Sequence, residues 1–81
     1  MNIKLIDGQF QNQDALDIIS SMIGIKIRFH EGKIQNSSNE EDIKMRENKI
    51  KFLQNELHQL RNTISPVSSS TTLTAVVNII T

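Results

Sequence analysis

IKMRENKIKFLQNELHQLRNTI, residues 43–64, is the stretch that decides the fold of this chain. Its apolar residues recur every seven positions, and two leucines fill positions three or four residues away. The set is Ile43, Ile50, Leu53, Leu57, Leu60 and Ile64. This spacing places all six side chains on one stripe of a helix, and a sustained seven-residue repeat requires a facing helix. We therefore predict a long amphipathic helix over residues 39–64 that packs against a second helix.

The signals at both ends support this helix. Ser38 followed by Glu41 fits a capping box, in which the two side chains satisfy free backbone N–H groups. Acidic residues at 40–42 and Arg61 near the other end both favour the helix dipole. Pro66 disfavours helical geometry in the residue before it, so the helix ends near residue 64.

The facing helix is predicted earlier in the chain. Asn12 can cap it, and apolar residues then follow at helical spacing. They are Ala15, Leu16, Ile18, Ile19, Met22 and Ile23. Polar residues 35–39 connect the two helices.

Residues 23–30, IGIKIRFH, admit two interpretations. Strict alternation of β-branched residues is typical of a strand, which gives an alternative α+β fold with a β-hairpin at 24–35. A helix that continues through Gly24 costs about 1 kcal/mol but extends the first apolar stripe to Ile25 and Phe29. Because the stripe of the second helix is about 33 Å long and needs a comparably long partner, we favour the continuous helix.

The two ends of the chain are predicted to add a short β element. Residues 2–6 favour a strand that ends in a turn at Asp7-Gly8, and residues 73–81 are β-prone and uncharged. We expect a mostly α fold, an antiparallel αα-hairpin with coiled-coil-like packing. Residues 1–65 form one strand-helix-helix domain, residues 66–72 a flexible linker, and residues 73–81 a β-prone tail. Three alternatives stay open for this tail, namely pairing with the N-terminal strand, pairing with a neighbouring chain and disorder, and we favour pairing because an unpaired apolar strand promotes aggregation.

One segment and the connector after it carry a resemblance. The run Lys26-Ile27-Arg28-Phe29-His30, followed by the Ser-containing connector at 36–40 and the heptads, resembles a group of small bacterial helical-hairpin proteins. The resemblance implies that this run lies on a helix. It implies no activity, because none is established for that group.

Composition excludes disulfide bonds and metal sites built on thiolates. The chain has no cysteine, and nine basic and nine acidic side chains give a net charge of zero. The N-terminus lacks the pattern of a signal peptide, so we expect a cytoplasmic protein. His30 and His58 would lie about 27 Å apart along the hairpin, too far to share a zinc ion within one chain. We therefore predict no enzyme activity, no metal, no cofactor and no small-molecule substrate.

The remaining expectation is a protein-interaction or scaffold protein that assembles through its heptad helix as a homodimer. The predicted interaction residues are Ile19, Ile23, Ile43, Ile50, Leu53, Leu57, Leu60 and Ile64. The face around Ile19 and Ile23 is expected to stay open for the partner. The alternative is a nucleic-acid-associated regulator that uses the basic side chains Lys44, Arg46, Lys49 and Lys51, although the interleaved acids make nucleic acid a poor partner.

Overall fold

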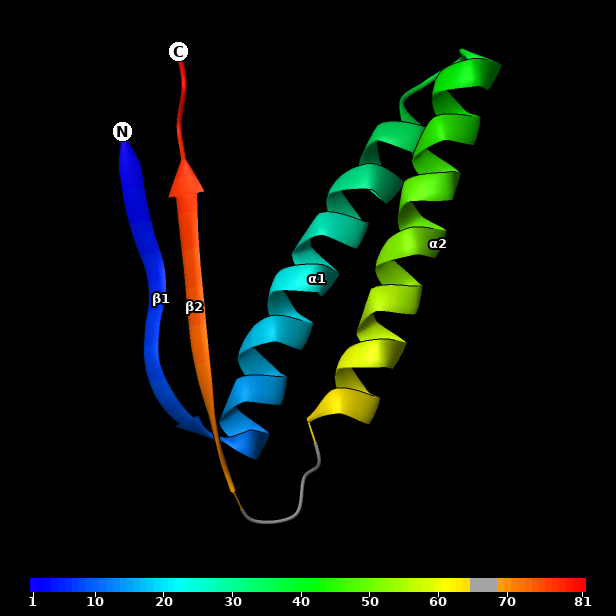
Figure 1. Cartoon of the computed structure of the whole chain (residues 1–81). Helices are drawn as coiled ribbons and strands as arrows, with labels where there is room; N and C mark the ends of the chain where they lie inside the picture. Colours follow the sequence, from blue (N-terminus) through cyan, green and yellow to red (C-terminus); the bar gives the residue numbers. More distant parts are fainter. Residues whose placement is uncertain (65–68) are drawn as a thin grey trace.

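The computed structural model describes residues 1–64 and 69–81, and these residues form two helices and two strands. The order is β1 (Asn2–Gln11), α1 (Asn12–Gln35), α2 (Glu40–Thr63) and β2 (Ser70–Asn78). The helices lie antiparallel against each other, while β1 and β2 form a separate two-stranded arm (Figure 1). The predicted mostly α hairpin with a short β element from the termini is confirmed.

Helix α1 runs without a break through Gly24 to Gln35. The alternative β-hairpin at 24–35 is therefore wrong. The physical reason is the length of α2, which has 24 residues and is matched by an α1 of 24 residues. A strand at this place would have left half of the α2 stripe without cover.

The two helix starts differ in detail from the sequence prediction. The side chain of Asn39 caps α2, because its Oδ1 accepts hydrogen bonds from the backbone N–H groups of Glu41 at 2.9 Å and Asp42 at 3.2 Å. The predicted cap, Ser38, lies one residue too early, and asparagine is an equally good cap. In α1 the capping position is Gln11 and not Asn12, which is the first helical residue.

The strands of the arm are antiparallel, from the pair Asn2–Asn78 to the pair Gln11–Ser70. β1 continues through Asp7-Gly8, so the predicted strand at 2–6 followed by a turn is too short. Pairing with β2 provides the reason, since it supplies hydrogen bonds along the whole segment. β2 begins at Ser70, within the predicted linker at 66–72; residues 65–68 lie outside the described part of the chain.

The arm and the hairpin meet at a vertex, where α1 begins. The backbone N–H of Asn12 donates to the Ser69 carbonyl at 3.1 Å. Its buried side chain donates to the hydroxyl of Ser69 at 3.2 Å and accepts from the hydroxyl of Thr71 at 2.6 Å. Ala15 is completely buried one turn further on. Beyond the vertex the arm and the hairpin diverge into the two limbs of a V (Figure 1).

Candidate functional site

One apolar surface that the fold leaves partly uncovered lies on α1. Five apolar residues of this helix are spaced alternately three and four positions apart. We call them the open stripe: Ala15, Ile18, Met22, Ile25 and Phe29. Ala15 is 0 % exposed at the vertex, Ile18 and Met22 are half-buried, and Ile25 and Phe29 are 59 % and 56 % exposed. The stripe therefore continues along α1 beyond the vertex, where the arm diverges from the helix (Figure 1).

The open stripe is separate from the side of α1 that packs on α2. His30 lies on the side of α1 that packs on α2, because its Nδ1 lies 3.1 Å from Nη1 of Arg46 in α2. Ile23 and Ile27, seven and three residues before His30, share its face. At 100° per residue, the centre of the open stripe lies roughly 130° around the helix axis from the face that carries His30. α1 thus presents two apolar faces, and α2 covers one of them.

The arm carries a second apolar surface, which we call the arm face. The paired residues Ile6–Ala75 and Gly8–Leu73 lie on the same side of the sheet as the buried Ile6. A β-bulge at Leu5 then shifts the register, so that the next pair on this side is Ile3–Val77. At the end of the arm these two side chains are 37 % and 41 % exposed.

The bulge keeps polar residues off the arm face. Lys4 and Asp7 lie three residues apart, a spacing that in a regular strand points them to opposite sides. Here their side chains form an ion pair of 3.5 Å, because the bulge places both on the opposite side of the sheet. If Leu5 were paired in a regular register instead of bulged, Lys4 and Asn2 would occupy the positions that Ile3 and Met1 now hold. The arm face is therefore apolar from the vertex to its exposed end.

The predicted interaction residues lie inside the hairpin or beside it. Leu53 and Ile64 are buried, and the other six, Ile19, Ile23, Ile43, Ile50, Leu57 and Leu60, are half-buried. Sequence reasoning expected an open face around Ile19 and Ile23, whereas Ile25 and Phe29 are more exposed. Their signal, the interval pattern from Ala15 to Phe29, is present in the sequence and is as regular as that of α2, but the prediction placed the open face on the neighbouring residues Ile19 and Ile23.

A polar contact joins the C-terminal part of α1 to the N-terminal part of α2. Arg46 occupies an apolar position of the heptad and has two partners, Asp42 at 3.4 Å and His30 at 3.1 Å. Its guanidinium carbon lies 5.9 Å from the centre of the Phe29 ring, and the ammonium of Lys33 lies 5.7 Å from it. Partial burial lowers the pKa of His30, and the positive charges of Arg46, Lys49 and Lys26 lower it further. The lowered pKa favours the neutral ring, and its Nδ1 can accept a hydrogen bond from the Arg46 guanidinium.

This contact predicts a pH dependence of stability. The unfolded chain binds a proton at His30 with the ordinary pKa of about 6.5, and the folded chain binds it less readily. The free energy of unfolding should therefore fall as pH drops below about 6.5, because the unfolded state gains protons first. Urea midpoints measured between about pH 7.5 and 5.5 check this. His30→Gln should flatten the slope, and His58→Gln, at an exposed position, should keep it; equal slopes in the two variants would contradict the assignment.

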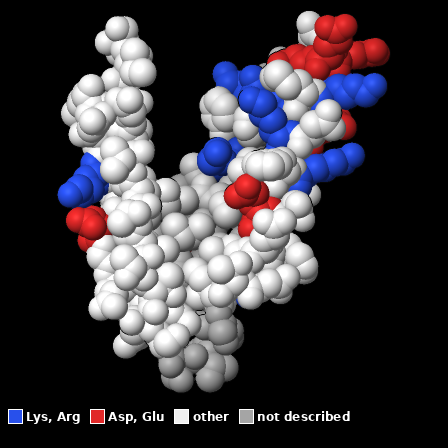
Figure 2. All heavy atoms as spheres, viewed as in Figure 1, with Lys and Arg blue, Asp and Glu red and all other residues white. Residues whose placement is uncertain are grey.

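The basic side chains predicted as one nucleic-acid face lie on two faces of α2. Lys44 and Lys51 are seven residues apart and share one side, whereas Arg46 is turned toward α1. Lys49 acts on His30 from the same side as Arg46. In Figure 2 acidic groups gather at the upper end of the hairpin, and the basic groups below them have further acidic groups among and beneath them. A single basic face for a phosphate backbone is therefore not formed by these four residues.

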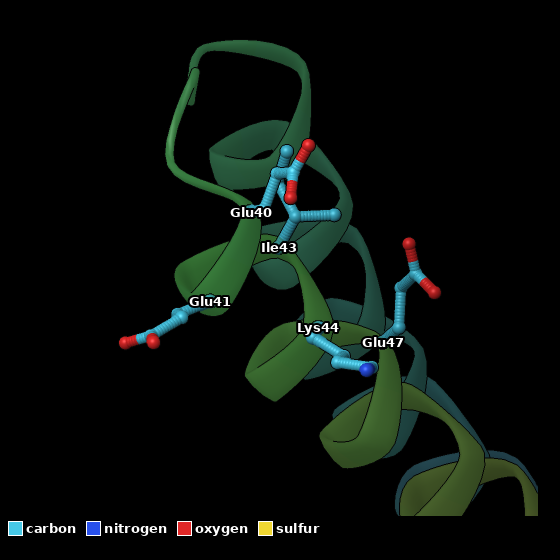
Figure 3. A pocket seen from close by; sticks show the side chains of 5 residues that line it. All are labelled: Glu40, Glu41, Ile43, Lys44 and Glu47. Carbon is cyan, nitrogen blue, oxygen red and sulfur yellow. The ribbon is translucent and has the colours of Figure 1, made fainter.

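Two of the surface hollows lined by described residues lie on the hairpin. One, of about 370 Å³, is lined by Glu40, Glu41, Ile43, Lys44 and Glu47 at the start of α2. Its charged groups do not converge, since the side chain of Glu41 points away from that of Glu47 (Figure 3). The other, of about 420 Å³, is lined by Gln13, Leu16, Asp17, Ser20 and Arg61.

Among residues 1–64 and 69–81 no group of three or more His, Asp and Glu side chains could hold a metal ion. Within the same described ranges, neither helix has the length and apolar character needed to cross a membrane. The chain matches no protein-family model, no curated protein and no solved structure. The open stripe and the arm face are thus the features on which a functional proposal can be built.

Proposed function

We propose that this chain is a small non-enzymatic interaction or scaffold protein that works as a homodimer. The observation that carries the proposal is its accessible surface of 6,282 Å². A compact monomer of 9.2 kDa exposes about 4,900 Å². The chain therefore exposes roughly 1,400 Å² more than its mass requires, and a stable interface buries about 800 Å² on each partner.

The dimensions of the chain support the same proposal. The radius of gyration is 15.3 Å, against about 12 Å for a compact domain of 81 residues and about 15 Å for one of 162 residues. One chain thus has the radius of gyration expected for a compact body formed by two chains. Among residues 1–64 and 69–81 the buried apolar side chains are few, namely Ile6, Ala15, Leu53 and Ile64, and a second chain would enlarge this core.

Sedimentation equilibrium tests this proposal. We expect a mass of twice 9.2 kDa, with a circular dichroism spectrum dominated by helix. A folded chain with the mass of one copy across the micromolar range would overturn the proposal. The partners that such a dimer would bring together are then sought with the intact dimer as bait.

A further inference from the structure

Besides the arm face, the dimer proposed above has two candidate seams on its helices, the heptad stripe of α2 and the open stripe of α1. The α2 stripe is already covered, since each of its six residues is buried or half-buried. The open stripe has the same alternation of three and four, which is the pattern of a helix-to-helix seam, and its second half is exposed. A stripe of this kind is self-complementary, so a second copy of this chain fits it.

The charges on α1 give the direction of pairing. Residues 12–25 contain Asp14 and Asp17 and no Lys or Arg, whereas residues 26–35 contain Lys26, Arg28 and Lys33 with one acid, Glu31. The first half of the helix is therefore acidic and the second half basic. Parallel pairing would set like charges beside each other, and antiparallel pairing sets each acidic half beside a basic half.

We propose that two copies of this chain pair through the open stripes of their α1 helices, running antiparallel, with Ile18 of each copy beside Phe29 of the other. Met22 and Ile25 form the central layers of this seam. The inference rests on the proposed homodimer and adds the surface and the direction of its interface. The cations Lys33 and Arg46, which flank the Phe29 ring, line the edge of the seam.

Single cysteines test the direction, because the chain has no cysteine of its own. We would prepare Ile18→Cys and Phe29→Cys separately and oxidise each alone and in an equimolar mixture. Ile18 and Phe29 are eleven residues apart, about 16 Å along a helix, and a disulfide needs Cα atoms within about 7 Å. The antiparallel seam predicts a cross-linked dimer in the mixture and none with either variant alone. Phe52→Cys, at a 62 % exposed position of α2, is the control that should not cross-link.

Each outcome has one meaning. Cross-linking of Ile18→Cys alone and of Phe29→Cys alone shows a parallel seam and overturns the inference. A dimeric wild-type chain, with folded variants that give no cross-link in the mixture, places the interface elsewhere and also overturns it, while the proposed homodimer stands. A monomeric wild-type chain removes both proposals. Circular dichroism of each variant establishes that the hairpin is folded before oxidation.

Discussion

Leu53→Asp combined with Leu57→Asp is expected to abolish the folded hairpin. Leu53 is buried and Leu57 half-buried on the face of α2 that packs against α1. Loss of a buried leucine such as Leu53 costs about 2–5 kcal/mol, and loss of the half-buried Leu57 costs less. An unpaired carboxylate in the same place adds a desolvation penalty. The total stability of a domain of this length is only about 4–12 kcal/mol. Far-ultraviolet circular dichroism should therefore show a disordered chain.

Gln54→Asp combined with His58→Asp is the matched control for that experiment. It introduces the same two charges at the same spacing of four, at positions that are both exposed. This control should retain its helix and its assembly state. If the leucine variant folds as well as the control does, the heptad stripe of α2 is not what holds the hairpin together.

The second large effect is expected at the vertex. Ala15→Asp places a longer, charged side chain where alanine is completely buried. Overpacking costs about 1–3 kcal/mol, and burying a carboxylate without a partner costs more. We expect the arm to separate from α1, and amide hydrogen exchange should show that β1 and β2 lose protection before the helices do.

Gln13→Asp controls for charge in the same turn, because Gln13 is exposed. Its strands should remain protected. Protection of β1 and β2 in Ala15→Asp equal to that in Gln13→Asp would mean that the arm does not depend on the vertex contact.

The hairpin could be predicted from sequence because both helices carry their own periodic signal. The heptads of α2 required a long partner, and this requirement decided residues 24–30 in favour of helix. The cap of α2 was misplaced by one residue because Ser38 and Asn39 both have suitable side chains. Their hydrogen bonds depend on backbone geometry that a local pattern does not contain.

The arm could be predicted only in part. Residues 2–6 and 73–81 are β-prone, but the continuation of β1 through Asp7-Gly8 depends on pairing with residues more than sixty positions away. The bulge at Leu5 becomes visible only when the opposite strand is in place. The contact between His30 and Arg46 likewise depends on how the two helices are aligned, so sequence reasoning placed both residues on helices without joining them.

The pairing of Asn2 with Asn78 also determines the order in which the chain can fold. The helices are joined by a connector of a few residues, so their contacts are close in sequence and form quickly. The strands must close a loop that contains both helices, and the entropy of that closure has to be overcome before any hydrogen bond between them forms. The hairpin should therefore appear first in refolding kinetics, and the arm should close last.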